Sequence, residues 1–171
     1  MAIAMAEICG LPLKEMPESW EDFKLPAGRF QEQIFPPGIR VIFDGYNASP
    51  LSFEAALQTF EGIRGTGRKI LVFSDMLELG AGEKDYHEAL GKRIAHSRLD
   101  GAVAYGPRTH WSFEIIRREN PKFAIEYVQN QEEAAARLEG RLQAGDMLLL
   151  KASRGMKIEG VLNYLFGQEG I

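Results

Sequence analysis

Three short stretches of this sequence place carboxylates, amides, hydroxyls and a guanidinium beside small residues, where a β-rich run gives way to a helical pattern. They are "FDGYNASP" (43–50), "SDMLELGAGE" (74–83) and "KASRGMKIEG" (151–160). Side chains of these types can hold a nucleotide, an ammonium group or a carboxylate. Ligands of an open parallel sheet bind beyond the carboxyl ends of its strands. The three stretches therefore predict one shared site, provided that their strands end at the same edge.

The first stretch contains a strand-to-helix junction and two residues that such a junction does not require. The strand end, the sharp turn, the helix cap and the first helical residue are expected at Asp44, Gly45, Ser49 and Pro50. Turn formation alone could account for Asp44 and Asn47, which is the simpler alternative. That alternative leaves Tyr46 unexplained, and it gives Asn47 no role beyond the turn.

The second stretch offers two carboxylates, with Asp75 at a strand end and Glu78 three residues later. They could hold a ligand's amine or a metal. Acidic residues are also ordinary neighbours of a helix N-terminus, so a purely structural role is an open alternative.

The third stretch follows the strand "MLLLK" and places Ser153, Arg154 and Gly155 at an expected helix start. Free backbone N–H groups, the helix dipole and a guanidinium together favour a carboxylate or phosphate. The alternative is a capping serine beside a solvated arginine.

Other segments point away from additional sites. The glycine-rich segment "GIRGTGRK" (62–69) precedes a strand, so its loop faces the wrong end of the sheet for a phosphate cradle. No G-x-x-x-x-G-K-[ST] motif occurs, so the chain lacks a recognisable nucleotide-triphosphate loop. No Cys/His spacing resembles a metal site. The histidines are expected on the surface or in packing: His87, His96 and His110.

Composition narrows the class of protein. The 171 residues, 45% of them hydrophobic, suffice for one main domain with a short appendage. A net charge of -4 leaves no basic footprint, so we expect no nucleic-acid partner. The single cysteine, Cys9, cannot form an internal disulfide and fits a reducing cytoplasm. The apolar opening carries Glu7 and no basic start, so we expect neither a signal peptide nor a membrane anchor.

Alternating patterns predict an α/β fold. Two β-rich runs, "RFQEQIF" and "IRVIFD", flank "PPG" and suit a hairpin. Four further apolar runs, at 68–75, 100–106, 123–128 and 145–151, are each followed by a helical pattern. One of these patterns places Tyr86, Leu90 and Ile94 on a face that needs a sheet to cover it. We expect a Rossmann-like three-layer domain, with a mostly parallel sheet and helices on both faces.

The start of the chain is expected to be a separate helical segment. An apolar stripe ends at Gly10 without a preceding start signal, so it looks like the last helix of an upstream unit. After a second short helical stretch, "KLPAGR" is typical of a linker. We therefore assign residues 1–28 to a helical tail and linker, and residues 29–171 to the main domain.

In order, "DGYNASP", "SDMLELG" and "LKASRGM" resemble the C-terminal domain of the Mur ligases, in particular the branch that adds D-alanyl-D-alanine. That family usually reads D-D-S-Y-N-A-N-P, G-D-M-x-E-L-G and K-G-S-R-G-M at these places. The positions that agree include Asp44, Tyr46, Asn47, Asp75, Ser153 and Arg154. The departures are Phe43, Gly45, Ser49, Ser74 and Ala152.

The resemblance implies an ATP-dependent ligase of peptidoglycan precursor synthesis, in which D-Ala-D-Ala attacks an acyl phosphate of a UDP-N-acetylmuramoyl-tripeptide. In that family, the phosphate loop and the Mg²⁺ ligands belong to a central ATPase domain, whose tail residues 1–28 would be. The UDP-sugar site belongs to an N-terminal domain. The C-terminal domain closes over ATP and positions the incoming amine. This chain would then hold no complete catalytic set and be inactive alone, and its partners would be the missing domains of a cytoplasmic polypeptide.

The resemblance also implies roles for individual residues. The nucleotide-binding set would be Arg29, Asp44, Tyr46 and Asn47, with Arg29 reaching a phosphate and Asp44 accepting from the ribose hydroxyls. The substrate-binding set would be Asn47, Asp75, Glu78, Lys151, Ser153 and Arg154. Its carboxylates would face the dipeptide's ammonium, and its basic and hydroxyl side chains would hold the dipeptide's carboxylate.

Two other functions remain open at this point. One is a stand-alone module that binds a small ligand at the same strand ends. The other is a related ligase of different specificity, such as one that recycles murein peptides. A phosphate-loop motif encoded upstream in the same reading frame would exclude the stand-alone module.

Overall fold

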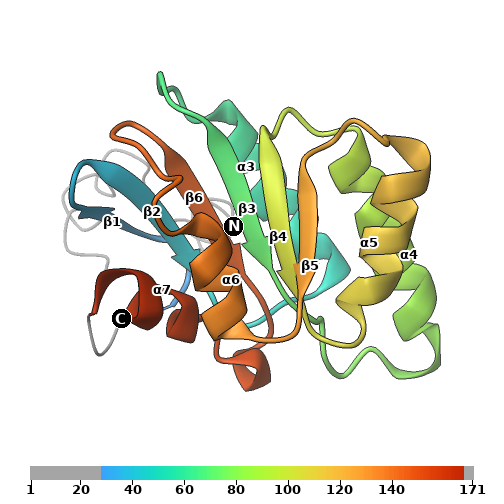
Figure 1. The fold of residues 1–171 in the computed structure, drawn as a ribbon. Coiled ribbons are helices and arrows are strands. Elements are labelled where there is room, and N and C mark those ends of the chain that lie inside the picture. Colours follow the sequence, from blue (N-terminus) through green and yellow to red (C-terminus); the bar gives the residue numbers. More distant parts are fainter. Residues whose placement is uncertain (1–27, 168–171) are drawn as a thin grey trace, which may run out of the picture.

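A computed structural model of the chain describes residues 28–167. The predictions for the helical tail, the linker before Gly28 and Cys9 lie outside these residues. The described part is a six-stranded sheet in the order β1-β2-β6-β3-β4-β5, with helices on both faces (Figure 1). The predicted Rossmann-like fold is confirmed.

The sheet is mixed, with one antiparallel strand at its edge. β1 pairs antiparallel with β2 across the turn that contains Pro36, Pro37 and Gly38, as the predicted hairpin requires. All the other pairs are parallel. The strands are β1 (Gln31–Phe35), β2 (Ile39–Asp44), β3 (Lys69–Phe73), β4 (Gly101–Tyr105), β5 (Ile125–Val128) and β6 (Met147–Lys151).

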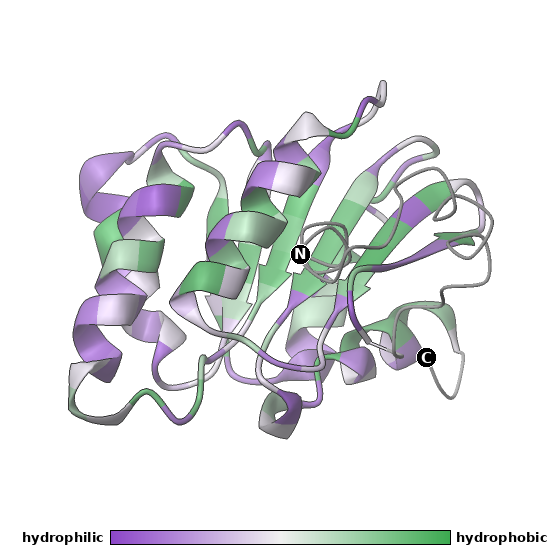
Figure 2. Cartoon of the chain, turned by 180° about the vertical axis from the view of Figure 1, so that it is seen from behind, coloured by the Kyte–Doolittle hydropathy of each residue, from purple (hydrophilic) through white to green (hydrophobic). Residues whose placement is uncertain are grey.

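The helices form two layers. They are α3 (Pro50–Gly62), α4 (Glu83–Ala95), α5 (Thr109–Glu119), α6 (Gln131–Leu138) and α7 (Glu159–Phe166), with short 3₁₀ turns η2 (Gly80–Gly82) and η3 (Arg154–Met156). From β2 the chain advances through β3 and β4 to β5, and it then returns to insert β6 between β2 and β3. Right-handed crossovers in opposite directions place their helices on opposite faces. Accordingly, α3, α4 and α5 cover one face (Figure 2), and α6 and α7 cover the other.

Buried apolar side chains on the two faces of the sheet form two cores. On the α3 side, Phe53 and Phe60 pack against Leu71 and Phe73 of β3. On the α6 side, a second core includes Val72, Val103, Leu148, Leu150, Ala134, Leu138, Val161 and Leu162. Successive residues of a strand point to opposite faces, so central strands must be apolar on both. This requirement explains the uninterrupted run "MLLLK" of β6.

Two local predictions differ from the structure. Tyr86 does not face the sheet; it is 44% exposed, and the buried position on that turn of α4 is His87. A helix does start after Ser153, but it is the short 3₁₀ helix η3, with Ser153 as its N-cap, and the α-helix α7 begins only at Glu159. Within residues 28–167, no helix is long and apolar enough to cross a bilayer.

Candidate functional site

The three predicted junctions meet at one edge of the sheet. β2, β6 and β3 are parallel neighbours, and their last residues lie in register: Asp44 opposite Lys151, and Lys151 opposite Phe73. The loops that follow these strands therefore leave from the same edge, which is the lower edge in Figure 1. The predicted convergence is confirmed.

The edge between β2 and β6 is also a topological switch point. The loop after β2 leads to α3 on one face, whereas the loop after β6 leads to α7 on the opposite face. Loops that part in this way leave a crevice between them, where open α/β sheets bind ligands.

A hollow of about 230 Å³ lies at this crevice, and we call it the carboxyl-end pocket. It is lined by Arg29, Phe30, Asp44, Tyr46, Asn47, Ser49, Ser52 and Lys151. The four residues expected at a nucleotide are thus together. Phe30 and Ser52 could not be predicted from the sequence, because their contact with the pocket depends on how the linker and α3 approach β2.

Asp44 is held at both carboxylate oxygens. Its Oδ1 accepts a hydrogen bond from the backbone N–H of Phe30 at 3.2 Å, and its Oδ2 lies 2.5 Å from the ammonium of Lys151. Lys151 also donates to the backbone oxygen of Asn47 at 3.2 Å. The structure therefore places Lys151 against the first junction.

The start of the described chain lies against the first junction as well. The backbone N–H of Tyr46 donates to the carbonyl of Gly28 at 3.0 Å. The guanidinium carbon of Arg29 stands 4.4 Å from the centre of the Tyr46 ring, a cation–π contact. Gly28 has a φ of 78°, which suits glycine. Arg29 and Tyr46 thus stand together beside the pocket.

The first junction folds as its turn chemistry predicts. The Ser49 side chain accepts from the backbone N–H of Ser52 at 3.3 Å, and the Ser52 hydroxyl accepts from the N–H of Ser49 at 2.9 Å. This reciprocal capping satisfies N–H groups at the start of α3, where Pro50 is the first residue. The cap fixes the direction in which the loop leaves Asp44.

Asp75 lies beneath the surface of the second junction. Its Oδ1 accepts from the backbone N–H groups of Arg108 and Thr109 at 3.0 and 2.9 Å, at the start of α5. Its Oδ2 has no hydrogen-bond partner among residues 28–167 and is 3.5 Å from the Arg108 guanidinium. Burial raises the pKa of the Asp75 carboxyl, although those N–H groups and nearby His87 act in the opposite direction. Asp75 therefore caps α5 from a neighbouring strand end.

His87 anchors the second junction to α4. Its Nε2 accepts from the backbone N–H of Met76 at 3.1 Å, which assigns the proton to Nδ1, 2.7 Å from the carbonyl of Glu83. Burial lowers the pKa of His87, so the neutral ring that this pairing needs is favoured. Glu78, farther along the same loop, is exposed and has a φ of 62°.

Ser153 ties the third junction to the other two. Its hydroxyl oxygen accepts from the N–H of Leu77 at 2.9 Å and lies 3.5 Å from the carbonyl oxygen of Ala48, to which it can donate. The side chain caps neither η3 nor α7. Arg154 is 65% exposed and stands 3.6 Å from the Glu159 carboxylate, so its guanidinium is accessible to a ligand.

The residues that depart from the usual family motif have structural explanations. A Cβ at Gly45 would come within 2.6 Å of the Phe43 ring and 2.8 Å of Ile158, so the large residue at 43 demands a small one at 45. Ser74 donates to the carbonyl of Tyr105 at 2.6 Å and links β3 to β4. Ser49 caps α3, and Ala152 is buried in the core beside α6 and α7.

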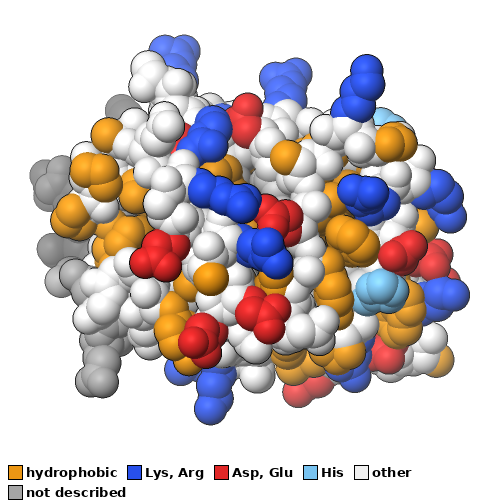
Figure 3. Space-filling model, viewed as in Figure 1, with side chains coloured by type: hydrophobic (Ala, Val, Ile, Leu, Met, Phe, Trp, Pro, Cys, Tyr) orange, Lys and Arg blue, Asp and Glu red, His pale blue; other side chains and the backbone are white. Residues whose placement is uncertain are grey.

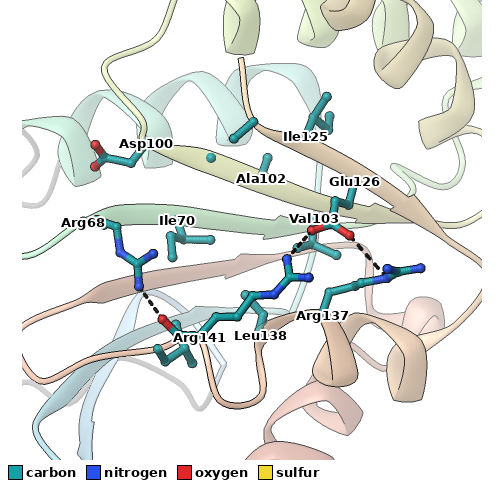
Figure 4. A pocket seen from close by; sticks show the side chains of 13 residues that line it. Arg68, Ile70, Asp100, Ala102, Val103, Ile125, Glu126, Arg137, Leu138 and Arg141 are labelled. Carbon is teal, nitrogen blue, oxygen red and sulfur yellow. Dashed lines mark hydrogen bonds and ion pairs between the residues drawn. The ribbon is translucent and has the colours of Figure 1, made fainter. Parts of the chain in front are cut away.

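A larger hollow, of about 340 Å³, lies at the opposite ends of the strands (Figure 4). Arg137 and Arg141 both reach the carboxylate of Glu126 there, at 3.3 and 2.7 Å, while Arg68 pairs with Asp146. Figure 3 shows basic and acidic side chains interspersed over this face. Because each of its guanidinium groups already contacts a carboxylate of the protein, and because its loops precede the strands, this hollow is the weaker candidate.

The chemistry of the carboxyl-end pocket is that of binding and orientation. Residues 28–167 contain no cluster of three or more His, Cys, Asp or Glu side chains that could hold a metal. The pocket offers a guanidinium, a carboxylate, an amide and an aromatic face, which together suit a phosphorylated ribose.

Arg108, at the neighbouring start of α5, was not predicted from the sequence. It lies in the short loop between β4 and α5, so the rule used for the other junctions could have found it.

Two curated relatives of this chain carry the same name. This chain is 31% identical over 164 residues to the UDP-N-acetylmuramoyl-tripeptide--D-alanyl-D-alanine ligase of Bacillus subtilis. The match covers 96% of this chain and 36% of the relative. The ligase of that name from Rickettsia prowazekii is 29% identical over 162 residues, covering 95% and 35%. The chain thus spans about a third of the length of these relatives.

Solved structures agree with this grouping. A MurF crystal structure from Acinetobacter baumannii superposes with a TM-score of 0.82 at 29% identity, covering 98% of this chain and 36% of that one. The MurF ligase of Thermotoga maritima in complex with ADP gives a TM-score of 0.75 at 29% identity, covering 95% and 35%. Residues 28–154 match the family described as "Mur ligase, glutamate ligase domain". With its three junctions at one sheet edge and most of its length in that match, the chain belongs to the Mur ligase family.

Proposed function

We propose that this chain is the C-terminal part of an ATP-dependent ligase that joins D-Ala-D-Ala to a UDP-N-acetylmuramoyl-tripeptide. The observation that carries the proposal is the carboxyl-end pocket, where Arg29, Asp44, Tyr46 and Lys151 meet at the switch point of the sheet. The names of the relatives describe this reaction, and one similar structure was solved with ADP.

The pocket would hold part of the nucleotide. Asp44 keeps lone pairs for the ribose hydroxyls beyond those used by Phe30 and Lys151, because an ionised carboxylate accepts at about four sites. Arg29 would turn from Tyr46 to a phosphate, and the exposed Tyr46 ring would then be open to the nucleotide. The phosphate loop and the Mg²⁺ ligands would belong to the central domain of the longer polypeptide.

The dipeptide would lie beside the second and third junctions. Exposed Arg154 is the candidate for its carboxylate, and exposed Glu78 for its ammonium. Asp75 and Ser153 are buried and bonded to backbone groups, which supports a role in shaping the loops around the dipeptide. Asn47, between Tyr46 and Ala48, would lie between the two ligands.

In this proposal, residues 1–28 are the tail and linker of the central domain, and residues 29–171 form the domain that closes on it. The start of the family match at residue 28 supports that division. The chain alone would be inactive because no phosphate-loop motif is present in it. Closure would orient the amine against an acyl phosphate and exclude water, inside the cytoplasm where nucleotide precursors are made.

The test is turnover by the polypeptide that includes the coding region preceding Met1. We expect release of phosphate that requires ATP, the UDP-linked tripeptide and D-Ala-D-Ala. Single amino acids in place of the dipeptide should not support it. Turnover with another amino component alone would favour a related ligase, and an upstream region without a G-K-[ST] loop would favour the stand-alone binding module.

A further inference from the structure

A buried lysine lies behind the carboxyl-end pocket. Lys151 is 1% exposed, at the last position of the central strand β6. Its ammonium lies 2.5 Å from Asp44 Oδ2 and 3.2 Å from the Asn47 carbonyl oxygen, and it stands 5.2 Å from the centre of the Phe53 ring. Every one of these partners belongs to the first junction or to the helix that follows it.

These contacts account for the donor capacity of the ammonium. An ammonium group has three N–H donors, and here one faces a carboxylate, one a carbonyl and one the π-face of an aromatic ring. Lys151 could bind a ligand carboxylate near Arg154 only if its ammonium gave up one of these contacts. Removing the lysine would leave the Asp44 carboxylate without its counter-charge at the end of the sheet, which is strongly unfavourable for a partly buried group.

Lys151 also determines which way the Asp44 carboxylate points. Oδ2 is held from the sheet side by Lys151, and Oδ1 from the linker side by the N–H of Phe30, so the carboxylate cannot rotate without losing a charge-assisted bond. The bond from Lys151 to the Asn47 carbonyl fixes the backbone on the other side of Tyr46.

We propose that Lys151 is a positioning residue for the nucleotide: it acts through Asp44 and the Asn47 backbone and does not touch the dipeptide. The proposal rests on the proposed function, since it assumes that Asp44 binds ribose. It differs from the role in dipeptide binding that the family resemblance implies.

The experiment is titration of the isotope-labelled chain with ADP, followed by NMR chemical shifts. We expect Lys151→Met to weaken ADP binding about tenfold, the equivalent of losing one charge-assisted hydrogen bond. Lys69→Met is the matched control. Lys69 also donates to a carbonyl, that of Glu61, and lies 6.0 Å from a phenylalanine ring, but it stands at the opposite end of the neighbouring strand. Its removal should leave ADP binding unchanged.

A double-mutant cycle separates positioning from direct contact. In the Asp44→Asn background, Lys151→Met should add little further loss of ADP affinity, because the group that it positions is already altered. An additional tenfold loss in that background would overturn the proposal. The double variant also removes both charges, so it is informative even where Lys151→Met alone fails to fold.

Titration with D-Ala-D-Ala supplies the remaining comparison. Lys151→Met should leave the shifts caused by the dipeptide unchanged, and a selective loss of dipeptide binding would show that the lysine belongs to the substrate site instead. If the unaltered chain does not bind ADP at millimolar concentrations, the proposed nucleotide site fails and this inference fails with it. If it binds ADP and the cycle is additive, only the inference on Lys151 fails.

Discussion

The hydroxyl oxygen of Ser153 accepts a hydrogen bond from the backbone N–H of Leu77 at 2.9 Å, and thereby joins the third junction to the second. The same hydroxyl reaches the carbonyl of Ala48 in the first junction at 3.5 Å. One buried side chain therefore sets the spacing of three loops that are far apart in the sequence.

Ser153→Ala should destabilise the chain by about 1–3 kcal/mol, because it leaves the N–H of Leu77 without a partner in a partly buried place. Urea denaturation followed by circular dichroism measures the loss. Ser97→Ala is the control, since the Ser97 hydroxyl accepts a long bond of 3.4 Å from the N–H of Leu99, away from the site. Equal losses in the two variants would show that the bond to Leu77 contributes nothing special.

Asp75→Ala should destabilise more than Asp75→Asn, by about 1–3 kcal/mol, because only alanine leaves the N–H groups of Arg108 and Thr109 without an acceptor. Asparagine keeps one acceptor oxygen. It also removes the carboxyl group of Asp75, whose pKa is raised by burial. Amide hydrogen exchange at Arg108 and Thr109 gives a local readout. Faster exchange in the alanine variant alone is expected, and unchanged exchange in both would contradict the capping role.

Much of the architecture could be predicted from the sequence because it depends on local patterns of residues. The alternation of apolar runs, the Ser49–Pro50 start of α3 and the hairpin around Gly38 depend on neighbouring residues. The family motifs located the site edge for the same reason. The direction of Lys151, the burial of Asp75 and the three-way contact of Ser153 depend on the insertion of β6 between β2 and β3, which no local pattern encodes. Tyr86 was misplaced because the helical period alone cannot tell it from His87, one position along.

Gly45→Ser, which restores the usual family residue, should destabilise this chain by about 1–3 kcal/mol, because its Cβ would overlap the Phe43 ring. Phe43→Ala alone leaves a cavity and should cost about 3–5 kcal/mol. Combined, the two changes should cost less than their sum, since the smaller side chain at 43 makes room at 45. Denaturation of the four proteins measures the coupling, and strict additivity would contradict the proposed packing.

The free energy of unfolding should depend on pH through the protonation of His87. Burial lowers its pKa in the folded chain, so the unfolded chain binds a proton first as the pH falls. Stability is then full above about pH 6.5 and decreases on acidification, by up to about 1.4 kcal/mol per pH unit, until the folded-state pKa is reached. His87→Gln should remove this slope. The raised pKa of Asp75 acts in the opposite sense, because protonation of that carboxyl favours the folded state. An identical slope in the variant would assign the effect to another group.

In the proposed function, one edge of the sheet holds two ligands, with the nucleotide at the first junction and the dipeptide at the second and third. Chemical-shift mapping of the labelled chain with ADP, and then with D-Ala-D-Ala, locates both ligands. We predict that ADP moves the signals of residues 44–47 and 151, and that the dipeptide moves those of residues 77–79 and 153–155. Shifts confined to the opposite hollow, at Arg68, Arg137 and Arg141, would exclude a ligand site at this edge.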